Sequence, residues 1–166
     1  MTLQAELHLK RGFDICAHEA VLSVYYTGSC LKKRADQILD RASLTDVQFN
    51  LMMLLKYQTG QDQGLSQTDL SMMMLVNRAN ITGLVDRMER SGLVVRSHSE
   101  SDRRRNVVRL TTHGKDLLNQ IEPVYVNEVN RIMSVLSASD QRRLISTLES
   151  LRRNVRPSTA EPKMGD

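Results

Sequence analysis

The chain has 166 residues, of which 40% are hydrophobic, and this suits one domain, or one domain with a helical extension. Only six residues are aromatic and none is tryptophan, which argues against a surface for single-stranded nucleic acid, because bases need exposed rings to stack on. The net charge is +4, and most of the excess lies in residues 66–114, where eight arginines stand against five acidic residues.

Membrane insertion and secretion are not expected. No apolar run approaches the roughly 18 residues that a membrane-spanning helix requires, and residues 1–11 lack the apolar core of a signal peptide. The chain contains two cysteines, Cys16 and Cys30, which one straight helix would hold too far apart to bridge. We therefore expect a cytoplasmic protein with reduced thiols and no membrane partner.

The first 58 residues are predicted to form two helices. Apolar residues at mostly helical spacing predict a long helix over residues 9–39, with Gly28 as a candidate interruption. Ser43 or Thr45 is expected to cap a second helix, whose apolar stripe consists of Val47, Leu51, Leu54 and Leu55. Residues 59–64 are predicted to form a turn-rich loop.

Two short helices with clear N-terminal signals come next. Ser66, followed three residues later by Asp69, predicts a capping box and a helix that turns Leu70, Met73 and Met74 inward. Asn77 is expected to cap the next helix, and Gly92 to end it in a left-handed conformation. Its apolar residues follow a strict i, i+3, i+4, i+7 spacing and are Ile81, Leu84, Val85 and Met88.

An arginine-rich hairpin follows the helix pair. Residues 93–96 and 107–110 are predicted as strands, and the polar loop between them contains Asp102, Arg103, Arg104 and Arg105. Neighbouring side chains of a ribbon face opposite sides, so one arginine can pair with Asp102 or the preceding helix while others reach a phosphate backbone. Helix, turn, helix and basic ribbon in this order predict a winged helix-turn-helix domain that binds double-stranded DNA.

The last third of the chain is predicted to be helical and to mediate dimerisation. Residues 115–137 and 139–155 form amphipathic helices, with a possible kink at Pro123 and a cap at Ser139-Asp140. Together with the first helix they carry more apolar surface than one small winged domain can cover. We expect four segments: dimerisation helix 9–43, DNA-binding domain 44–114, dimerisation helices 115–156 and disordered tail 157–166.

The helix that begins after Asn77 is the candidate recognition helix. Arginine pairs with guanine, asparagine with adenine, and the methyl groups of alanine and threonine can touch the thymine methyl. The predicted DNA-binding residues are Arg78, Ala79, Asn80, Thr82 and Arg87, with Arg103, Arg104 and Arg105 in the hairpin.

An ordered set of short segments resembles the MarR family of bacterial transcriptional regulators. The segments are residues 65–70 (LSQTDL), 80–89 (NITGLVDRME), 92–96 (GLVVR), 102–104 (DRR) and 110–114 (LTTHG), with 44–45 and 48–49 extending the match. The resemblance implies a homodimer that reads a palindromic operator, and the family's Asp-x-Arg wing motif falls on Asp102 and Arg104. It also implies a repressor that a small phenolic or other aromatic ligand releases, bound between the dimerisation helices and the DNA-binding lobe.

Other functions remain open beside this one. Cys16 lies early in the first helix, as in the branch of the family that senses organic peroxides, and Cys30 is a second thiol. A winged helix can also serve as a protein-interaction module. An enzyme is not expected, because no phosphate-binding glycine loop or nucleophile elbow is present, and we expect no cofactor or metal site.

Overall fold

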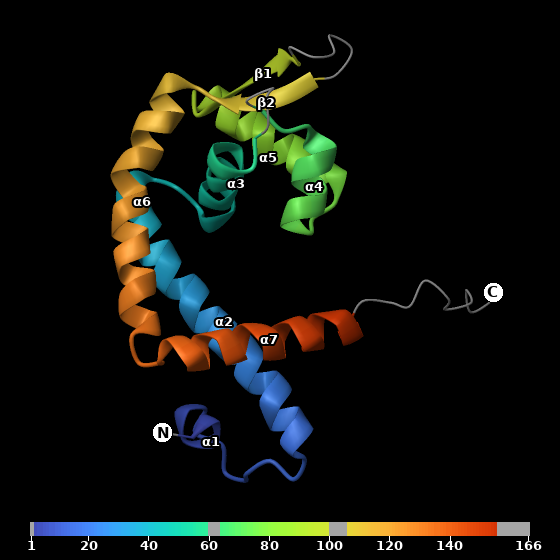
Figure 1. The fold of residues 1–166 in the computed structure, drawn as a ribbon, viewed down its shortest axis with the longest axis vertical. Helices are drawn as coiled ribbons and strands as arrows, with labels where there is room; N and C mark the ends of the chain where they lie inside the picture. Colours follow the sequence, from blue (N-terminus) through green and yellow to red (C-terminus); the bar gives the residue numbers. More distant parts are fainter. Residues whose placement is uncertain (1, 60–63, 100–105, 156–166) are drawn as a thin grey trace, which may run out of the picture. The chain divides into compact units, whose positions relative to one another are not determined.

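The computed structural model describes residues 2–59, 64–99 and 106–155. The chain forms two compact units, Met1–Tyr125 and Val126–Asp166. The elements of the first unit follow one another as α1 (Leu3–Glu6), α2 (Cys16–Leu39), the 3-10 helix η1 (Asp40–Ala42), α3 (Asp46–Tyr57), α4 (Gln67–Met74), α5 (Arg78–Arg90), β1 (Val94–His98) and β2 (Asn106–Leu110). Helix α6 (Thr112–Met133) crosses from the first unit into the second, and α7 (Ala138–Val155) belongs to the second (Figure 1).

The first long helix begins later than its apolar spacing predicts. Helix α2 starts at Cys16 rather than near residue 9, and Thr2 caps a separate short helix, α1. Gly12 and Asp14 are poor helix formers, and His8 adopts a left-handed conformation with φ of 51°. Gly28, in contrast, does not interrupt α2, because the helix continues through it to Leu39.

Side-chain caps set the starts of α3, α4 and α5. Thr45, not Ser43, caps α3, in a reciprocal pair with Gln48. The predicted pair of Ser66 and Asp69 caps α4, with an Asp69 N to Ser66 Oγ distance of 3.1 Å. The side chain of Asn77 accepts a hydrogen bond from the Asn80 N–H at 2.8 Å and so caps α5. These contacts satisfy backbone donors that a helix start leaves unpaired.

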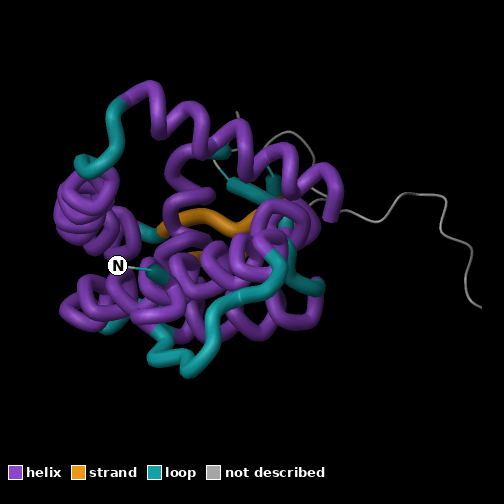
Figure 2. Tube along the Cα trace, turned by 90° about the horizontal axis from the view of Figure 1, so that it is seen from below, coloured by secondary structure: helices purple, strands orange, loops and turns teal. Residues whose placement is uncertain are grey.

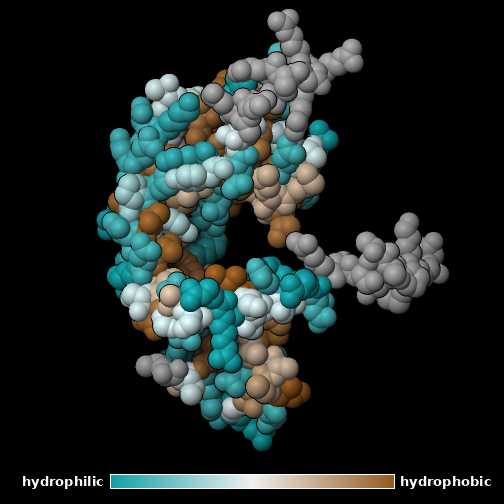
Figure 3. All heavy atoms as spheres, viewed as in Figure 1, coloured by the Kyte–Doolittle hydropathy of each residue, from teal (hydrophilic) through white to brown (hydrophobic). Residues whose placement is uncertain are grey.

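The hydrophobic core of the first unit lies between α2, α3, α5, the hairpin and α6. The apolar stripe of α5 is buried throughout, and the Phe49 ring lies 4.7 Å from that of Tyr125, centroid to centroid. Two expected core positions are exposed instead, Val47 on α3 and Met73 on α4. Helix α4 has only eight residues, so it presents a narrow face to the core, which Leu70 occupies. Apolar atoms at the C-terminal end of α4 consequently reach the surface (Figure 3).

The two strands form an antiparallel ribbon that Leu65 extends. Val94 pairs with Leu110 and His98 with Asn106, so the strands are longer towards the loop than the apolar pattern predicts. Leu65 exchanges two backbone hydrogen bonds with Val108, at 3.1 and 2.8 Å. Figure 2 shows the strands in orange among the helices. Asp102, Arg103, Arg104 and Arg105, named above as wing residues, lie outside the described residues.

Helix α6 is attached directly to the turn that ends α5. Gly92 adopts φ of +71°, which confirms the predicted left-handed stop. The Thr111 hydroxyl donates to the Gly92 carbonyl at 2.6 Å and accepts from the Gly114 N–H at 2.9 Å. A Cβ on Gly114 would lie 2.1 Å from the Leu93 carbonyl oxygen, so only glycine fits there.

The second unit consists of the end of α6 and helix α7. Pro123 is accommodated within α6, which continues to Met133. The cap of α7 is Ser137 rather than Ser139 or Asp140, because the Asp140 N–H donates to Ser137 Oγ at 3.2 Å. None of the residues of α7, all of which the structure describes, is buried. Among the described residues no helix combines the length and apolar character needed to span a bilayer.

Candidate nucleic-acid interface

Helix α5 separates its residues into a buried face and an exposed one. Ile81, Val85 and Met88 have 0% exposure, which fixes the rotation of the helix about its axis. Arg78, Ala79 and Asn80, in the first turn, are all exposed. The first turn therefore presents one guanidinium and one amide to solvent next to a helix N-terminus, which favours anionic groups.

A polar groove of about 600 Å³ lies beside this first turn. Its lining comes from the start of α4, from α5 and from the start of β2, and consists of Ser66, Gln67, Thr68, Asp69, Arg78, Thr82 and Asn106. The Thr82 hydroxyl lies 2.8 Å from Gln67 Oε1 and 3.0 Å from the Arg78 carbonyl oxygen. Thr82, predicted as a DNA-binding residue, is thus also a link between α4 and α5.

The remaining predicted residue of α5, Arg87, is exposed and lies one turn beyond Gly83. Its Nη1 atom would be 3.5 Å from a Cβ built on Gly83. A side chain at position 83 would therefore contact this guanidinium. Of the predicted DNA-binding residues, the structure brings Arg78 and Thr82 together in the groove, whereas Arg87 stands further along the helix.

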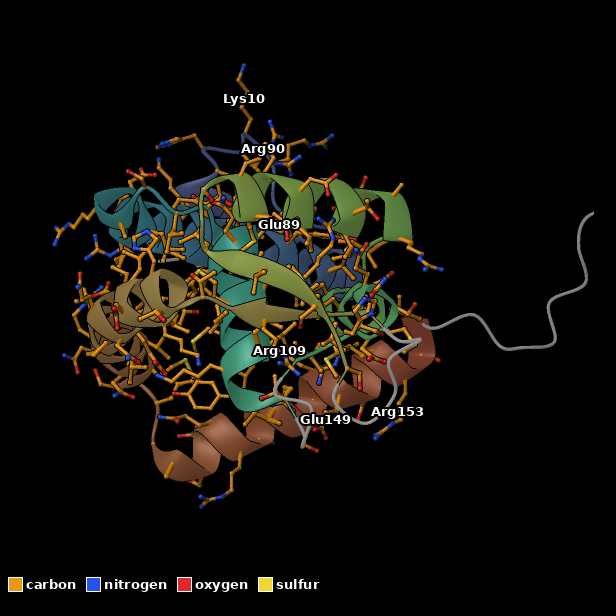
Figure 4. All side chains as sticks on the ribbon, turned by 90° about the horizontal axis from the view of Figure 1, so that it is seen from above. Lys10, Glu89, Arg90, Arg109, Glu149 and Arg153 are labelled. Carbon is orange, nitrogen blue, oxygen red and sulfur yellow. The ribbon has the colours of Figure 1, made fainter. Side chains whose placement is uncertain are left out.

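Arg96 ties the hairpin to α5, and sequence reasoning did not single it out. Its guanidinium pairs with Glu89 at 2.5 Å and also with Asp86, while its backbone N–H donates to Glu89 Oε1 at 2.9 Å. That backbone hydrogen bond, partly opposed by burial and reinforced by the guanidinium, holds the pKa of Glu89 below its usual value. Figure 4 labels Glu89 on α5, above the hairpin.

The signal for this contact is present in the sequence. Asp86 and Glu89 are three residues apart and so share a helix face, and Arg96 follows in the next strand. We expected an arginine of the hairpin to pair with the helix, but considered only Arg103, Arg104 and Arg105. The structure shows that Arg96, in β1, makes such a pair.

A pocket of about 240 Å³ lies between α2, α3 and α6. Phe49, Leu31 and Tyr125 provide apolar and aromatic walls, and Lys32 and Asp46 line it as well. Lys32 Nζ lies 2.9 Å from Asp46 and 3.3 Å from Asp36. The hydrogen bond to Asp46, followed by the weaker contribution of Asp36, raises the pKa of Lys32 against the opposing effect of desolvation.

Both cysteines are free and exposed on α2. Cys16 is the first residue of the helix, and Cys30 lies beyond Gly28 in the same element. Both thiols are therefore accessible to solvent in a single copy of the chain.

Comparison with known proteins identifies the family. The MarR family model matches residues 44–105, from the residue before the α3 cap into the wing. The HTH-type transcriptional repressor YetL of Bacillus subtilis is 29% identical over 83% of this chain and 81% of its own length. Residues 44–105 therefore form a MarR family domain.

Further relatives agree with this assignment. The uncharacterized HTH-type regulator YfiV of Bacillus subtilis is 36% identical, over 54% of this chain and 56% of its own length. Sco3205 of Streptomyces coelicolor, a MarR family regulator solved with DNA, superposes with a TM-score of 0.77 at 23% identity, over 92% of this chain and 96% of its own. CouR of Rhodococcus jostii RHA1, solved with p-coumaroyl-CoA, superposes with a TM-score of 0.75 at 21% identity, over 90% of this chain and 100% of its own.

The match to the MarR family model covers the helix-turn-helix and the start of the wing. The matched region contains α4, the turn, α5 and β1, which are the helix-turn-helix and the first strand of the wing. The chain is accordingly a DNA-binding transcriptional regulator of the winged-helix class, as its sequence predicts.

Proposed function

We propose that this protein is a homodimeric repressor that reads a palindromic operator with α5 and the wing. The observation that carries the proposal is the exposed first turn of α5, where Arg78 and Asn80 stand on a helix whose opposite face is buried. Arginine and asparagine are the side chains best suited to guanine and adenine in the major groove. Thr82, Arg87 and the wing residues Arg103, Arg104 and Arg105 complete the proposed interface, and Asp102 and Arg104 supply the Asp-x-Arg wing motif.

Dimerisation is supported by apolar side chains that each unit leaves exposed. On α2, Val21, Val24 and Tyr25 are 51%, 47% and 72% exposed. On α7 the exposed apolar residues are Leu144, Ile145, Leu151 and Val155. A second copy of the chain would cover such surfaces, and twofold symmetry would place two recognition helices about 34 Å apart, in successive major grooves.

We infer that the effector is a small aromatic molecule, bound in the pocket between α2, α3 and α6. The Phe49 and Tyr125 rings offer aromatic walls, and Lys32 offers a cation for a phenolate or carboxylate. The aromatic moiety named in the CouR complex is consistent with this class of ligand. A ligand that draws Lys32 away from Asp46 would loosen the link between α2 and α3.

Peroxide sensing through Cys16 is the second candidate. The thiol is exposed at the start of a long helix, where an oxidant can reach it. Replacing Cys16 with serine distinguishes the two effector hypotheses. If the effector is aromatic, the ligand still releases the variant from DNA. If the effector is a peroxide, the variant no longer responds to it.

The experiment that tests the proposal is a fluorescence-anisotropy titration of the full chain against the duplex upstream of its own gene and a scrambled duplex. A sequence-specific regulator binds the first roughly a thousandfold more tightly. Adding 4-hydroxybenzoate and, separately, peroxide then identifies the class of effector. Weak, equal and salt-sensitive binding to both duplexes, even after unbiased site selection, contradicts the operator proposal, and loss of all DNA affinity favours a protein-interaction module.

A further inference from the structure

Gln67, the first residue of α4, joins the two helices of the helix-turn-helix through its side chain. Its Oε1 atom accepts a hydrogen bond from the Thr82 hydroxyl of α5 at 2.8 Å. Both residues line the polar groove beside the first turn of α5, which Arg78 lines as well. Gln67 is half-buried in this position, and it is not among the DNA-binding residues that the sequence predicts.

The Thr82 hydroxyl has two acceptors within reach but only one proton to donate. Gln67 Oε1 lies at 2.8 Å and the Arg78 carbonyl oxygen at 3.0 Å. That carbonyl also accepts the backbone N–H of Thr82 within the α-helix, so the hydroxyl donates to Gln67 through the shorter contact. A threonine hydroxyl that bonds the carbonyl four residues back tends to bend its helix. Gln67 therefore keeps the first turn of α5 regular.

The amide nitrogen of Gln67 is available to a partner outside the chain. Among the described residues no acceptor contacts this Nε2 atom, and it is not one of the buried unpaired atoms, so its two N–H groups are accessible. Arg78 is exposed and places a positive charge in the same groove. In a helix-turn-helix the first helix crosses the sugar-phosphate backbone while the second enters the major groove. A phosphate oxygen is thus the acceptor that these N–H groups would meet.

We propose that Gln67 is a positioning residue for base reading, which holds Thr82 through its amide oxygen and a DNA backbone phosphate through its amide nitrogen. Phosphate contacts fix the register and orientation of a protein on the duplex but carry no sequence information themselves. One planar amide would transmit that register to α5, the helix that carries Arg78 and Asn80. The inference rests on the proposed reading of bases by α5.

Anisotropy titrations of the full chain against the operator and the scrambled duplex test the two contacts of Gln67. Gln67→Met keeps the apolar stem and removes both polar atoms. Its affinity for the scrambled duplex should fall about fivefold, because a hydrogen bond to phosphate is lost. Its preference for the operator over the scrambled duplex should fall by a further factor of about five, because the first turn of α5 is no longer held. Gln120→Met, at an exposed position on α6, is the matched control and should change neither quantity.

Two further variants distinguish positioning from a general loss of structure, and urea denaturation shows that each variant is folded. Thr82→Val removes the hydroxyl at nearly equal volume and should lower the operator preference by the same factor as Gln67→Met. The double variant should show no further loss of preference, because the two side chains act as one unit. Gln67→Glu keeps an acceptor for Thr82 and should retain the operator preference, although its negative charge weakens binding to every duplex.

The two contacts can be refuted separately. An operator preference in Gln67→Met equal to that of wild type would overturn the link to Thr82, and so would additive losses in the double variant or a lost preference in Gln67→Glu. Unchanged affinity of Gln67→Met for the scrambled duplex would overturn the phosphate contact. If wild type prefers neither duplex, the operator proposal fails, whereas the affinity of Gln67→Met for the scrambled duplex still decides whether Gln67 contacts DNA.

Discussion

At the scale of single residues, we propose that the first turn of α5 decides which bases are read. Asn80 is exposed, and its own backbone N–H is already satisfied by the Asn77 cap. Its side chain can therefore be changed without loss of the helix start. Its neighbour Thr82, by contrast, uses its hydroxyl within the protein, so a substitution there would alter both the interface and the link between α4 and α5.

Asn80→Ala should relax the preference at one base pair by about 1–3 kcal/mol and leave the unfolding free energy nearly unchanged. Anisotropy titrations against single-base variants of the operator measure the change. Asn154→Ala, an exposed position on α7, is the control. An unaltered preference at every position of the operator would remove Asn80 from the readout.

Gly114 shows the opposite situation, a residue whose size is fixed by its surroundings. Because a Cβ there would overlap the Leu93 carbonyl, Gly114→Ala should lower the unfolding free energy by about 3 kcal/mol. A Cβ on Gly28 would meet no other atom of the chain within 4 Å, so Gly28→Ala should instead raise it by about 1 kcal/mol through higher helix propensity. Urea denaturation compares the two, and equal effects would contradict the close contact.

At the scale of elements, the hairpin is oriented by Arg96 and its two carboxylate partners on α5. Arg96→Met keeps the apolar stem and removes both pairs. The expected loss of stability is below about 1 kcal/mol, because these side chains are partly exposed and solvent screens them.

The larger effect of Arg96→Met should be on DNA, since a loosely held wing binds the phosphate backbone less well. Affinity should fall by a similar factor for operator and scrambled duplexes. Arg90→Met, at the exposed C-terminal end of α5, is the matched variant. A selective loss for the operator alone would instead indicate that Arg96 reads bases.

The contact between α3 and α6 is sensitive to pH through Glu122. Since its pKa is lowered in the folded chain, the stability from Lys56 and Tyr57 is complete above the unfolded value of about 4.3 and is lost as the pH falls through the folded value. Wild type should therefore exceed Glu122→Gln in unfolding free energy at pH 7, and the difference should shrink below about pH 4. Urea denaturation at several pH values tests this. A difference in unfolding free energy that does not change with pH would rule out the ionised Glu122 as its source.

At the scale of the whole molecule, the exposed apolar residues of α2 and α7 call for a partner. We expect a dimeric mass by light scattering at micromolar concentration. Leu151→Glu should shift the protein towards monomer, because it places a charge among apolar side chains worth about 1.5–3 kcal/mol each when buried. Ser146→Glu, on the opposite face of α7, should leave the mass unchanged. A monomeric wild type would contradict the dimer.

Much of the DNA-binding region follows from local sequence signals. The caps at Ser66 and Asn77, the apolar stripe of α5 and the stop at Gly92 act over three to seven residues, so their physical chemistry is complete within a short stretch. Local signals were wrong at two helix starts. Apolar spacing predicted a start near residue 9 for α2, which begins only after Gly12 and Asp14. Ser139-Asp140 was predicted to cap α7, which is capped by Ser137 instead.

The sequence by itself determined the class of fold and the family resemblance, and it singled out α5 as the candidate recognition helix, because periodicity, caps and short motifs lie within a continuous stretch of chain. Only the tertiary structure decided that Arg96 joins the wing to α5, that Gly114 must lack a side chain, and that Lys56 meets Glu122. Those contacts join residues of different elements, up to 66 positions apart in the chain, and no local pattern encodes which of these side chains will meet when a core closes.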